Sequence, residues 1–373
     1  GYNKLLNQSK KIFDVGFTKL SDKPFISFFK MLGVVPNLII LKSYLTVSQL
    51  VNKYLKNSYL RKAFSIHPLL VGGDPHTTTS IYALIHYLER KWGVFFCMGG
   101  TGKIVAELKK LMIDNNIKIK TKTEVKELVI ENNKISKIIT NNEEISGFDL
   151  VVCNADPPMV YSKLLQKYHL QRPFKKEKNL LYSMGLFVLF FGTKKKYNNI
   201  AHHTIWMTKR FKSLLNDIFK KKILSKDFSL YIHRPTATDK SFAPDGCDSY
   251  YVLCPVPNLK GSVDWDIESE KLKDRIVSEL SKTIMPDLEE VITDIFWMNP
   301  NDFKNDYNSM HGSGFSIAPI FTQSAWFRYH NKDKKIKNLY FSAAGSHPGA
   351  GIPGVLSSAK VVENIIKNEL KSK

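Results

Sequence analysis

Apolar residues near the C-terminus change their spacing within one stretch, residues 338–367. The short apolar run Leu339-Tyr340-Phe341 is followed by small residues and glycines, and from Val355 apolar residues recur every three or four positions. The first pattern predicts a buried strand and the last predicts an amphipathic helix. Glycines between them allow positive φ angles and close approach of a ligand to the backbone, and a helix start offers unpaired N–H groups. The stretch therefore predicts strand, glycine turn and helix, which is typical of a cofactor-binding turn and also of an ordinary tight turn.

Elsewhere the pattern predicts a helical N-terminal region followed by a chain that is rich in strands. A helical stripe runs through Tyr2, Leu5, Ile12 and Phe13. Further helices are expected at residues 24–32, 36–41, 81–90 and 101–112. Strands are expected at residues 117–121, 125–131, 135–140, 149–153, 182–192, 230–234 and 250–255. The strand at 149–153 is expected to be buried. This mixture predicts an α/β (α+β) fold, and 373 residues favour more than one domain.

The excess of basic residues favours a negatively charged binding partner. The chain has 55 Lys and Arg against 34 Asp and Glu, a net charge of +21. The sequence has no zinc-finger spacing and no RNA-binding aromatic motif, so an anionic membrane surface is favoured over nucleic acid. Apolar helices flanked by lysines at residues 24–41 fit a protein that lies in the membrane interface, although a buried helical subdomain would show the same pattern. The four cysteines form no C-x-x-C pair, which is typical of reduced thiols in a cytoplasmic protein.

Several stretches together resemble one enzyme family. Residues 343–360, AAGSHPGAGIPGVLSSAK, are similar to the C-terminal flavin-contacting signature of the bacterial-type phytoene desaturases, in the amine-oxidase-like FAD superfamily. Residues 1–20, 60–102, 154–156, 249–257 and 322–330 agree in order and spacing. The resemblance implies an FAD/NAD(P)-binding Rossmann-like domain, incomplete at its N-terminus, with a mixed-sheet substrate domain and a helical membrane-associating subdomain. The implied division is a helical part at 1–92, FAD-binding parts at 93–158 and 336–373, and a substrate-binding part at 159–335.

The resemblance also implies the residues that contact FAD. The Gly99–Thr101 loop would lie against the isoalloxazine end, and the backbone at Val125 would meet the adenine. The implied cofactor-binding residues are Gly99, Gly100, Thr101, Val125, Asn154, Ala155, Gly345, Gly351, Ile352, Pro353, Gly354 and Val355.

The catalytic acid or base stays unassigned. His67 and His86 are candidates, but a lone histidine in an apolar run is more often a core residue. Residues 29–33 lack the Arg and Asp that some relatives carry there, so no role is transferred. His202 and His203 are adjacent, and side chains of neighbouring strand residues diverge, so no metal site is expected there.

The implied activity is FAD-dependent desaturation of phytoene to neurosporene or lycopene, an oxidation of CH–CH bonds. Expected partners are phytoene, a membrane lipid surface, and quinone or oxygen as electron acceptor, with no nucleic acid and with the protein bound peripherally to the inner face of the cell membrane. No N-terminal strand, G-x-G-x-x-G and helix of a first Rossmann unit is found, and we expect the chain to be a fragment that lacks this unit. Alternatives are a related dehydrosqualene desaturase or carotenoid ketolase, or a non-catalytic fragment that cannot hold FAD.

Overall fold

The computed structural model describes residues 1–25, 28–170 and 179–371, and their contacts divide the chain into two units. The first unit comprises Gly1–Gly93, Lys122–Ser183 and Phe315–Lys373, and the second comprises Val94–Thr121 and Met184–Gly314. Both helices and sheets are present, which confirms the α/β (α+β) expectation. The four-part functional division remains a prediction.

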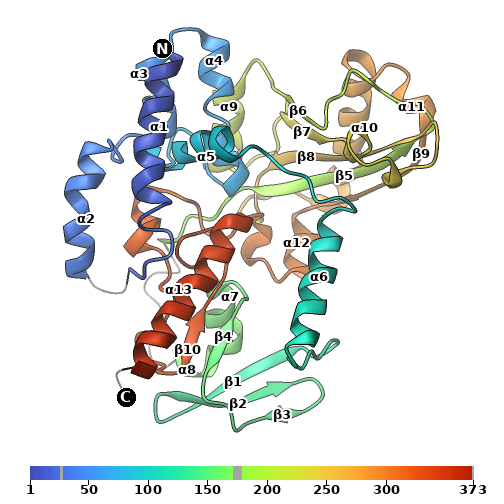
Figure 1. Cartoon of the computed structure of the whole chain (residues 1–373). Coiled ribbons are helices and arrows are strands. Elements are labelled where there is room, and N and C mark those ends of the chain that lie inside the picture. Colours follow the sequence, from blue (N-terminus) through green and yellow to red (C-terminus); the bar gives the residue numbers. More distant parts are fainter. Residues whose placement is uncertain (26–27, 171–178, 372–373) are drawn as a thin grey trace. The chain divides into compact units, whose positions relative to one another are not determined.

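The N-terminal part of the first unit is helical, as predicted (Figure 1). The separate helices expected at 24–32 and 36–41 are wrong in their bounds, because a single helix spans Phe28–Ile40 with Pro36 inside it. Its first helix buries Leu5, Ile12 and Phe13 on one side, which confirms the stripe seen in the sequence. Thr46 and Gln49 form a reciprocal capping box at the start of the third helix, which fixes where that helix begins. The helices are α1 Tyr2–Gly16, α2 Phe28–Ile40, α3 Val47–Tyr54, α4 Ser58–Ala63 and α5 Leu84–Trp92. Residues 26 and 27 of the predicted 24–32 helix lie outside the described residues.

Two small sheets complete the first unit. One is an antiparallel meander in which Asn132 and Asn133, both with positive φ, form the first hairpin turn. Its strands are β1 Val125–Glu131, β2 Lys134–Thr140 and β3 Glu144–Ile145. The other is a parallel pair of β10 Leu339–Phe341 and β4 Val151–Cys153. The remaining helices of this unit are α7 Pro157–Met159, α8 Gln166–Leu170 and α13 Ile352–Lys371.

Two predictions about strands are wrong. Residues 117–121 form no strand, and Ile117 and Ile119 are exposed. The strand predicted as buried at 149–153 is shorter, and Val152 is 47% exposed. Both segments are apolar in composition, but composition does not show whether other parts of the chain cover them. In the described residues, Ile117, Ile119 and Val152 stay exposed.

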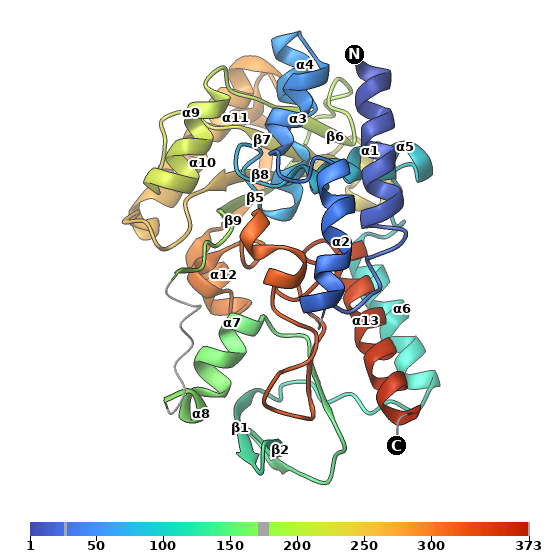
Figure 2. The same cartoon turned by 90° about the vertical axis from the view of Figure 1, so that its left-hand side faces the viewer.

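The second unit is built on a five-stranded antiparallel sheet with the strand order β6-β7-β8-β5-β9. One face of this sheet packs on α10 through Phe187, Leu189, Ile232 and Val252, all nearly fully buried (Figure 2). The strands are β5 Gly185–Thr193, β6 His203–Trp206, β7 Leu230–His233, β8 Asp248–Val256 and β9 Ile292–Met298. The helices are α6 Thr101–Asp114, α9 Phe211–Asn216, α10 Trp265–Thr283, α11 Leu288–Val291 and α12 Pro300–Asp306. Among the described residues of the whole chain, no helix has both the length and the apolar content that crossing a membrane requires.

Candidate active site

In the first unit, the parallel pairing of β4 with β10 brings together two segments that are nearly 190 residues apart. Phe341 pairs with Cys153 at the ends of the strands, and the Ser342 N–H donates to the Cys153 carbonyl at 2.9 Å. The side-chain amide of Asn154 donates to the Ser342 carbonyl at 2.5 Å. Carboxyl ends of parallel strands meet at one edge of a sheet, where open α/β sheets bind ligands. The predicted residues Asn154 and Ala155 therefore lie beside the predicted glycine turn.

Gly345 is required by the close packing between these segments. A Cβ atom at Gly345 would overlap the Asp156 carboxylate and would lie 2.8 Å from Pro157 Cδ. The same carboxylate accepts a hydrogen bond from Ser316 Oγ at 2.6 Å. Burial raises the pKa of Asp156 to about 6. The missing side chain at Gly345 thus makes room for a hydrogen-bonded carboxyl group behind the turn.

The turn leads into a long helix whose start is open to solvent. Gly349 and Gly351 have φ of +139° and +94°, a region that L side chains rarely adopt. A Cβ at Gly354 would lie 2.6 Å from the Gly349 carbonyl oxygen, so the helix approaches its own turn closely. Ile352 at the start of α13 is 62% exposed, and Pro353 is exposed as well. The exposed helix start favours an anionic ligand through the positive dipole end of α13, although Pro353 in its first turn has no N–H to donate.

A buried arginine holds the back of the turn, and sequence reasoning did not assign it. Arg328 is 1% exposed and donates to three backbone carbonyls, those of Ala344 at 2.6 Å, Ser346 at 3.1 Å and Gln323 at 3.4 Å. A buried charge without hydrogen-bond partners is costly in free energy, so the guanidinium needs these three bonds. The same bonds hold the three carbonyl groups in place. The signal in the sequence was a single arginine within the apolar run at residues 325–329, inside a stretch already noted for its resemblance.

Asn331 reinforces the same turn. Its side-chain amide donates to the carbonyls of Phe341 at 3.1 Å and His347 at 2.8 Å, and also contacts Ser358 Oγ at 2.9 Å. Strand, turn and helix α13 are thereby tied to one side chain. His347 itself is buried, and its pKa is lowered to about 3, chiefly by burial. These hydrogen bonds preorganise the turn from its buried side.

The other predicted cofactor residues are distributed over both units. Val125 opens β1 in the first unit. Gly99, Gly100 and Thr101 belong to the second unit, where both glycines have positive φ and the Gly99 N–H donates to Asp239 Oδ2 at 2.8 Å. The structure therefore brings Asn154, Ala155 and the turn at Gly345–Val355 together within one unit, and the contacts of the remaining residues with a cofactor stay predictions.

In the second unit, the sheet face opposite α10 carries partly exposed apolar and aromatic side chains. The rings of Phe190 and Phe296 stack with centroids 4.8 Å apart, and Phe296 is 57% exposed. Tyr251 packs against Phe190, and Tyr231 lies next to Tyr251. We call this surface the aromatic face; it comprises Phe190, Ile205, Tyr231, Tyr251, Leu253 and Phe296. It is suited to an apolar ligand, because it is not part of the core that packs on α10.

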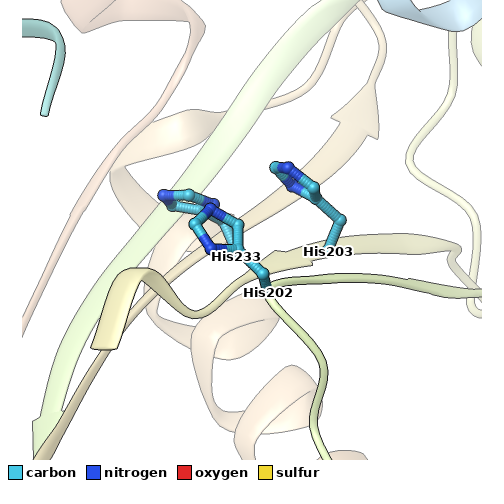
Figure 3. Close-up of side chains that lie close together, drawn as sticks. All are labelled: His202, His203 and His233. Atoms are coloured by element: carbon cyan, nitrogen blue, oxygen red, sulfur yellow. The ribbon is translucent and has the colours of Figure 1, made fainter. Parts of the chain in front are cut away.

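Three histidines lie at the β6 end of the same face (Figure 3). The ring centroids of His202 and His203 are 4.5 Å apart, and those of His202 and His233 are 4.7 Å apart. The expectation that His202 and His203 diverge is wrong, because β6 begins at His203 and His202 precedes the strand. Burial, with the neighbouring histidines, lowers the pKa of His233 to about 4.

The two acid/base candidates lie in an aromatic cluster of the first unit. The rings of His67 and His86 are 5.7 Å apart, and the ring of Phe64 meets His86 edge-on. His67 Nε2 lies 3.3 Å from Glu89 Oε2. Burial lowers the pKa of His86 to about 4, so this imidazole is neutral at pH 7. These contacts are those of packed core histidines, and a catalytic role for either one stays a prediction.

Comparison with known proteins agrees with this geometry. A sequence model for flavin containing amine oxidoreductase matches residues 43–362. The chain belongs to this family. A lycopene-forming phytoene desaturase of Pseudescherichia vulneris is 43% identical over 100% of the chain and 76% of its own length. A neurosporene-forming phytoene desaturase of Rhodobacter capsulatus is 37% identical over 100% of the chain and 72% of its own length. Within the flavin amine oxidoreductases, the chain is therefore of the bacterial carotenoid desaturase type.

Solved structures of the family share the fold at low identity. An oxidoreductase from Methanosarcina mazei superposes with a TM-score of 0.60 at 16% identity, covering 92% of this chain and 73% of that one. Cyclohexylamine oxidase from Brevibacterium oxydans superposes with a TM-score of 0.56 at 12% identity, covering 99% and 75%. The architecture of this flavin amine oxidoreductase is thus that of its family.

Proposed function

We propose that this protein is an FAD-dependent phytoene desaturase, which dehydrogenates phytoene to neurosporene or lycopene. The observation that carries the proposal is the identity of 43% to a lycopene-forming phytoene desaturase, which extends over the whole chain and therefore over both units. Relatives with other products are less similar: a 4,4'-diapophytoene desaturase of Staphylococcus haemolyticus is 33% identical over 89% of the chain. The C40 substrate is accordingly favoured over the C30 substrate.

The preorganised turn before α13 supports FAD as the cofactor. The backbone at Gly345, Gly351 and Gly354 permits close approach, and the exposed start of α13 offers N–H groups to an anionic or carbonyl oxygen. When bound, the flavin supplies the two-electron acceptor that no amino-acid side chain provides. The residues proposed to hold it are Asn154, Ala155, Gly345, Gly351, Ile352, Pro353, Gly354 and Val355, together with Gly99, Gly100, Thr101 and Val125.

The aromatic face supports a long hydrocarbon as the substrate. The stacked rings of Phe190 and Phe296 present apolar surface, with Asp294 two residues further along the same face of β9. Such a surface binds a polyene by burying its CH groups, at about 0.8 kcal/mol for each CH₂ equivalent, and excludes water from it. We assign the aromatic face to substrate binding.

Exposed apolar side chains on and after α2 support contact with a membrane. Ile39 and Ile40 are 60% and 70% exposed, and Tyr44 is 66% exposed. With the net charge of +21, they favour peripheral binding to an anionic lipid surface at the inner face of the membrane. A lipid-soluble quinone, or oxygen, is the electron acceptor that this location would supply.

Production of the protein in cells that accumulate phytoene, with any Rossmann segment that its gene encodes before Gly1 included, tests this function. We expect coloured carotenes in pigment extracts and visible flavin absorbance in the purified protein. Phe296→Asp should lower carotene formation about tenfold or more, because it removes an apolar contact of about 1.5–3 kcal/mol, and it should leave flavin absorbance unchanged.

Ile267→Asp is the matched control, because Ile267 is 55% exposed on α10, away from the aromatic face. This variant should form carotenes as the unsubstituted protein does. Colourless extracts from the unsubstituted protein with flavin bound would contradict the substrate, and purification without flavin would contradict the cofactor.

A further inference from the structure

The pairing of β6 with β7 places two histidines directly opposite each other. His203 and His233 are cross-strand partners in the register of these two strands. Side chains of such partners leave the sheet on the same face with their Cβ atoms about 4.5–5.5 Å apart. His202 immediately precedes β6, where the alternation of a strand does not apply, and its ring turns toward His233. Figure 3 shows the three imidazoles gathered on one side of the strands.

The nitrogen atoms of this triad are close enough to share one ion. Each histidine offers one ring nitrogen, and the three nitrogens lie within 4.8 Å of one another. Tetrahedral coordination of Zn²⁺ at 2.0–2.1 Å from nitrogen requires separations of about 3.3 Å, which small side-chain rotations would provide. His202 Nε2 and His233 Nδ1 are buried and have no hydrogen-bond partner among the residues that the structure describes. Buried polar atoms in proteins are nearly always bonded, so these two nitrogens require an explanation.

Groups around the triad are those that orient metal-binding imidazoles. His202 Nδ1 lies 2.5 Å from Thr238 Oγ1, and His203 Nδ1 lies 2.7 Å from the Tyr231 hydroxyl. A hydrogen bond at one ring nitrogen fixes the tautomer and directs the other nitrogen to the metal. In His202 this leaves Nε2, the atom without a partner, as the ligand.

We propose that His202, His203 and His233 form a binding site for a divalent transition-metal ion of the Zn²⁺ class. Three neutral imidazoles suit Zn²⁺, Cu²⁺ and Ni²⁺ rather than Mg²⁺ or Ca²⁺, which prefer oxygen ligands. Three protein ligands leave a fourth position open for water or another donor. The exposed position of His203 on the edge strand β6 gives the ion a route from solvent.

Among the described residues, one other group has comparable spacing, formed by His67, His86 and Glu89. There His67 Nε2 already pairs with Glu89 Oε2 at 3.3 Å, and of the three residues only His86 has a buried nitrogen for which the described ranges offer no partner. In the histidine triad of the second unit, two ring nitrogens are buried without a hydrogen-bond partner in the described part of the chain. The triad is therefore the stronger site.

Zinc binding to the purified protein tests the proposal. After removal of metals with a chelator, titration calorimetry with Zn²⁺ alone should show one equivalent bound to the triad with micromolar or tighter affinity. His203→Gln should lower the stoichiometry by one equivalent, or weaken this binding at least tenfold. Because His203 is exposed on an edge strand, we expect the variant to fold, and circular dichroism checks this. If Zn²⁺ also binds at His67, His86 and Glu89, the unsubstituted protein binds two equivalents and His203→Gln binds one, so the number of equivalents distinguishes the two sites.

His311→Asn is the matched control within the same unit. His311 has a φ of 57°, which Asn tolerates, and the charges of three nearby lysines, Lys222, Lys260 and Lys304, disfavour a cation there. This variant should bind Zn²⁺ with unchanged stoichiometry. With Cu²⁺ in place of Zn²⁺, electron paramagnetic resonance should show coupling to imidazole nitrogen that corresponds to fewer nitrogens, or to less bound Cu²⁺, in His203→Gln. No stoichiometric binding to the unsubstituted protein, or equal binding to His203→Gln, would overturn the proposal.

Discussion

Replacement of Gly345 by alanine isolates the packing that holds the turn. The new Cβ would overlap Asp156 Oδ1 and lie 2.8 Å from both Pro157 Cδ and Ser316 Oγ. Gly345 does not have a φ in the left-handed region, so the absence of space rather than backbone strain makes the substitution unfavourable. Alanine must therefore displace the carboxyl group from Ser316 or shift the turn away from β4.

The expected cost follows from two contributions. Overpacking a closely packed position costs about 1–3 kcal/mol, and loss of the Asp156–Ser316 hydrogen bond adds about 1 kcal/mol. For a unit of this size, each kcal/mol lowers Tm by about 2–4 °C, so the summed cost of about 2–4 kcal/mol predicts a decrease of about 4–16 °C. Because the turn moves, the variant should also lose flavin during gel filtration.

Thermal unfolding followed by circular dichroism, together with flavin absorbance, measures both effects. Gly33→Ala is the control in the same unit, since Gly33 lies in α2 with nothing within 4 Å of the added Cβ. This variant should be as stable as the unsubstituted protein or up to about 1 kcal/mol more stable, because alanine favours the helix. Equal Tm and equal flavin content in Gly345→Ala and in the unsubstituted protein would refute the assigned role of the close contact.

Two further predictions concern the buried charges behind the turn. Arg328→Met leaves three backbone carbonyls without their donor and should lower the free energy of unfolding by about 3–5 kcal/mol in urea titrations; a change below about 1 kcal/mol would contradict the role of this side chain. The pKa of Asp156 is raised in the folded state to about 6 from about 3.9 in the unfolded chain, so its contribution to stability is greatest below pH 4 and decreases as pH rises to about 7. The free energy of unfolding of the unsubstituted protein relative to Asp156→Asn should therefore fall across this range, by at most about 3 kcal/mol; a difference independent of pH would contradict the raised pKa.

The sequence correctly predicted the helices and strands in which the spacing of apolar residues matches the side of the element that is buried. The strand at Leu339–Phe341 is fully buried, and α13 begins three residues before the predicted Val355. Strands β5, β7 and β8 also lie where apolar runs predicted them, because their inner side chains pack on α10. In these cases local pattern and tertiary packing agree.

The missed features depend on contacts between distant segments. Arg328 acts on carbonyls 16 and 18 residues away, and a lone arginine in an apolar run carries no sign of its partners. The histidine triad requires the register of β6 against β7 and the position of His202 just outside the strand. Neither can be read from spacing. The resemblance named the glycine turn, but only the folded chain shows what holds that turn in place.

The arginine behind the turn has a consequence for how the turn can vary. Its guanidinium contacts carbonyl oxygens of the main chain, which every amino acid possesses. In a planar trans peptide the C=O and the following N–H point in opposite directions, so orienting the Ala344 carbonyl toward Arg328 directs the Gly345 amide away from it. The Arg328 guanidinium on the buried side of the turn thus determines that N–H groups face the opposite side. At positions of the turn where neither packing nor a positive φ requires glycine, side chains can therefore change while the direction of the backbone dipoles stays the same.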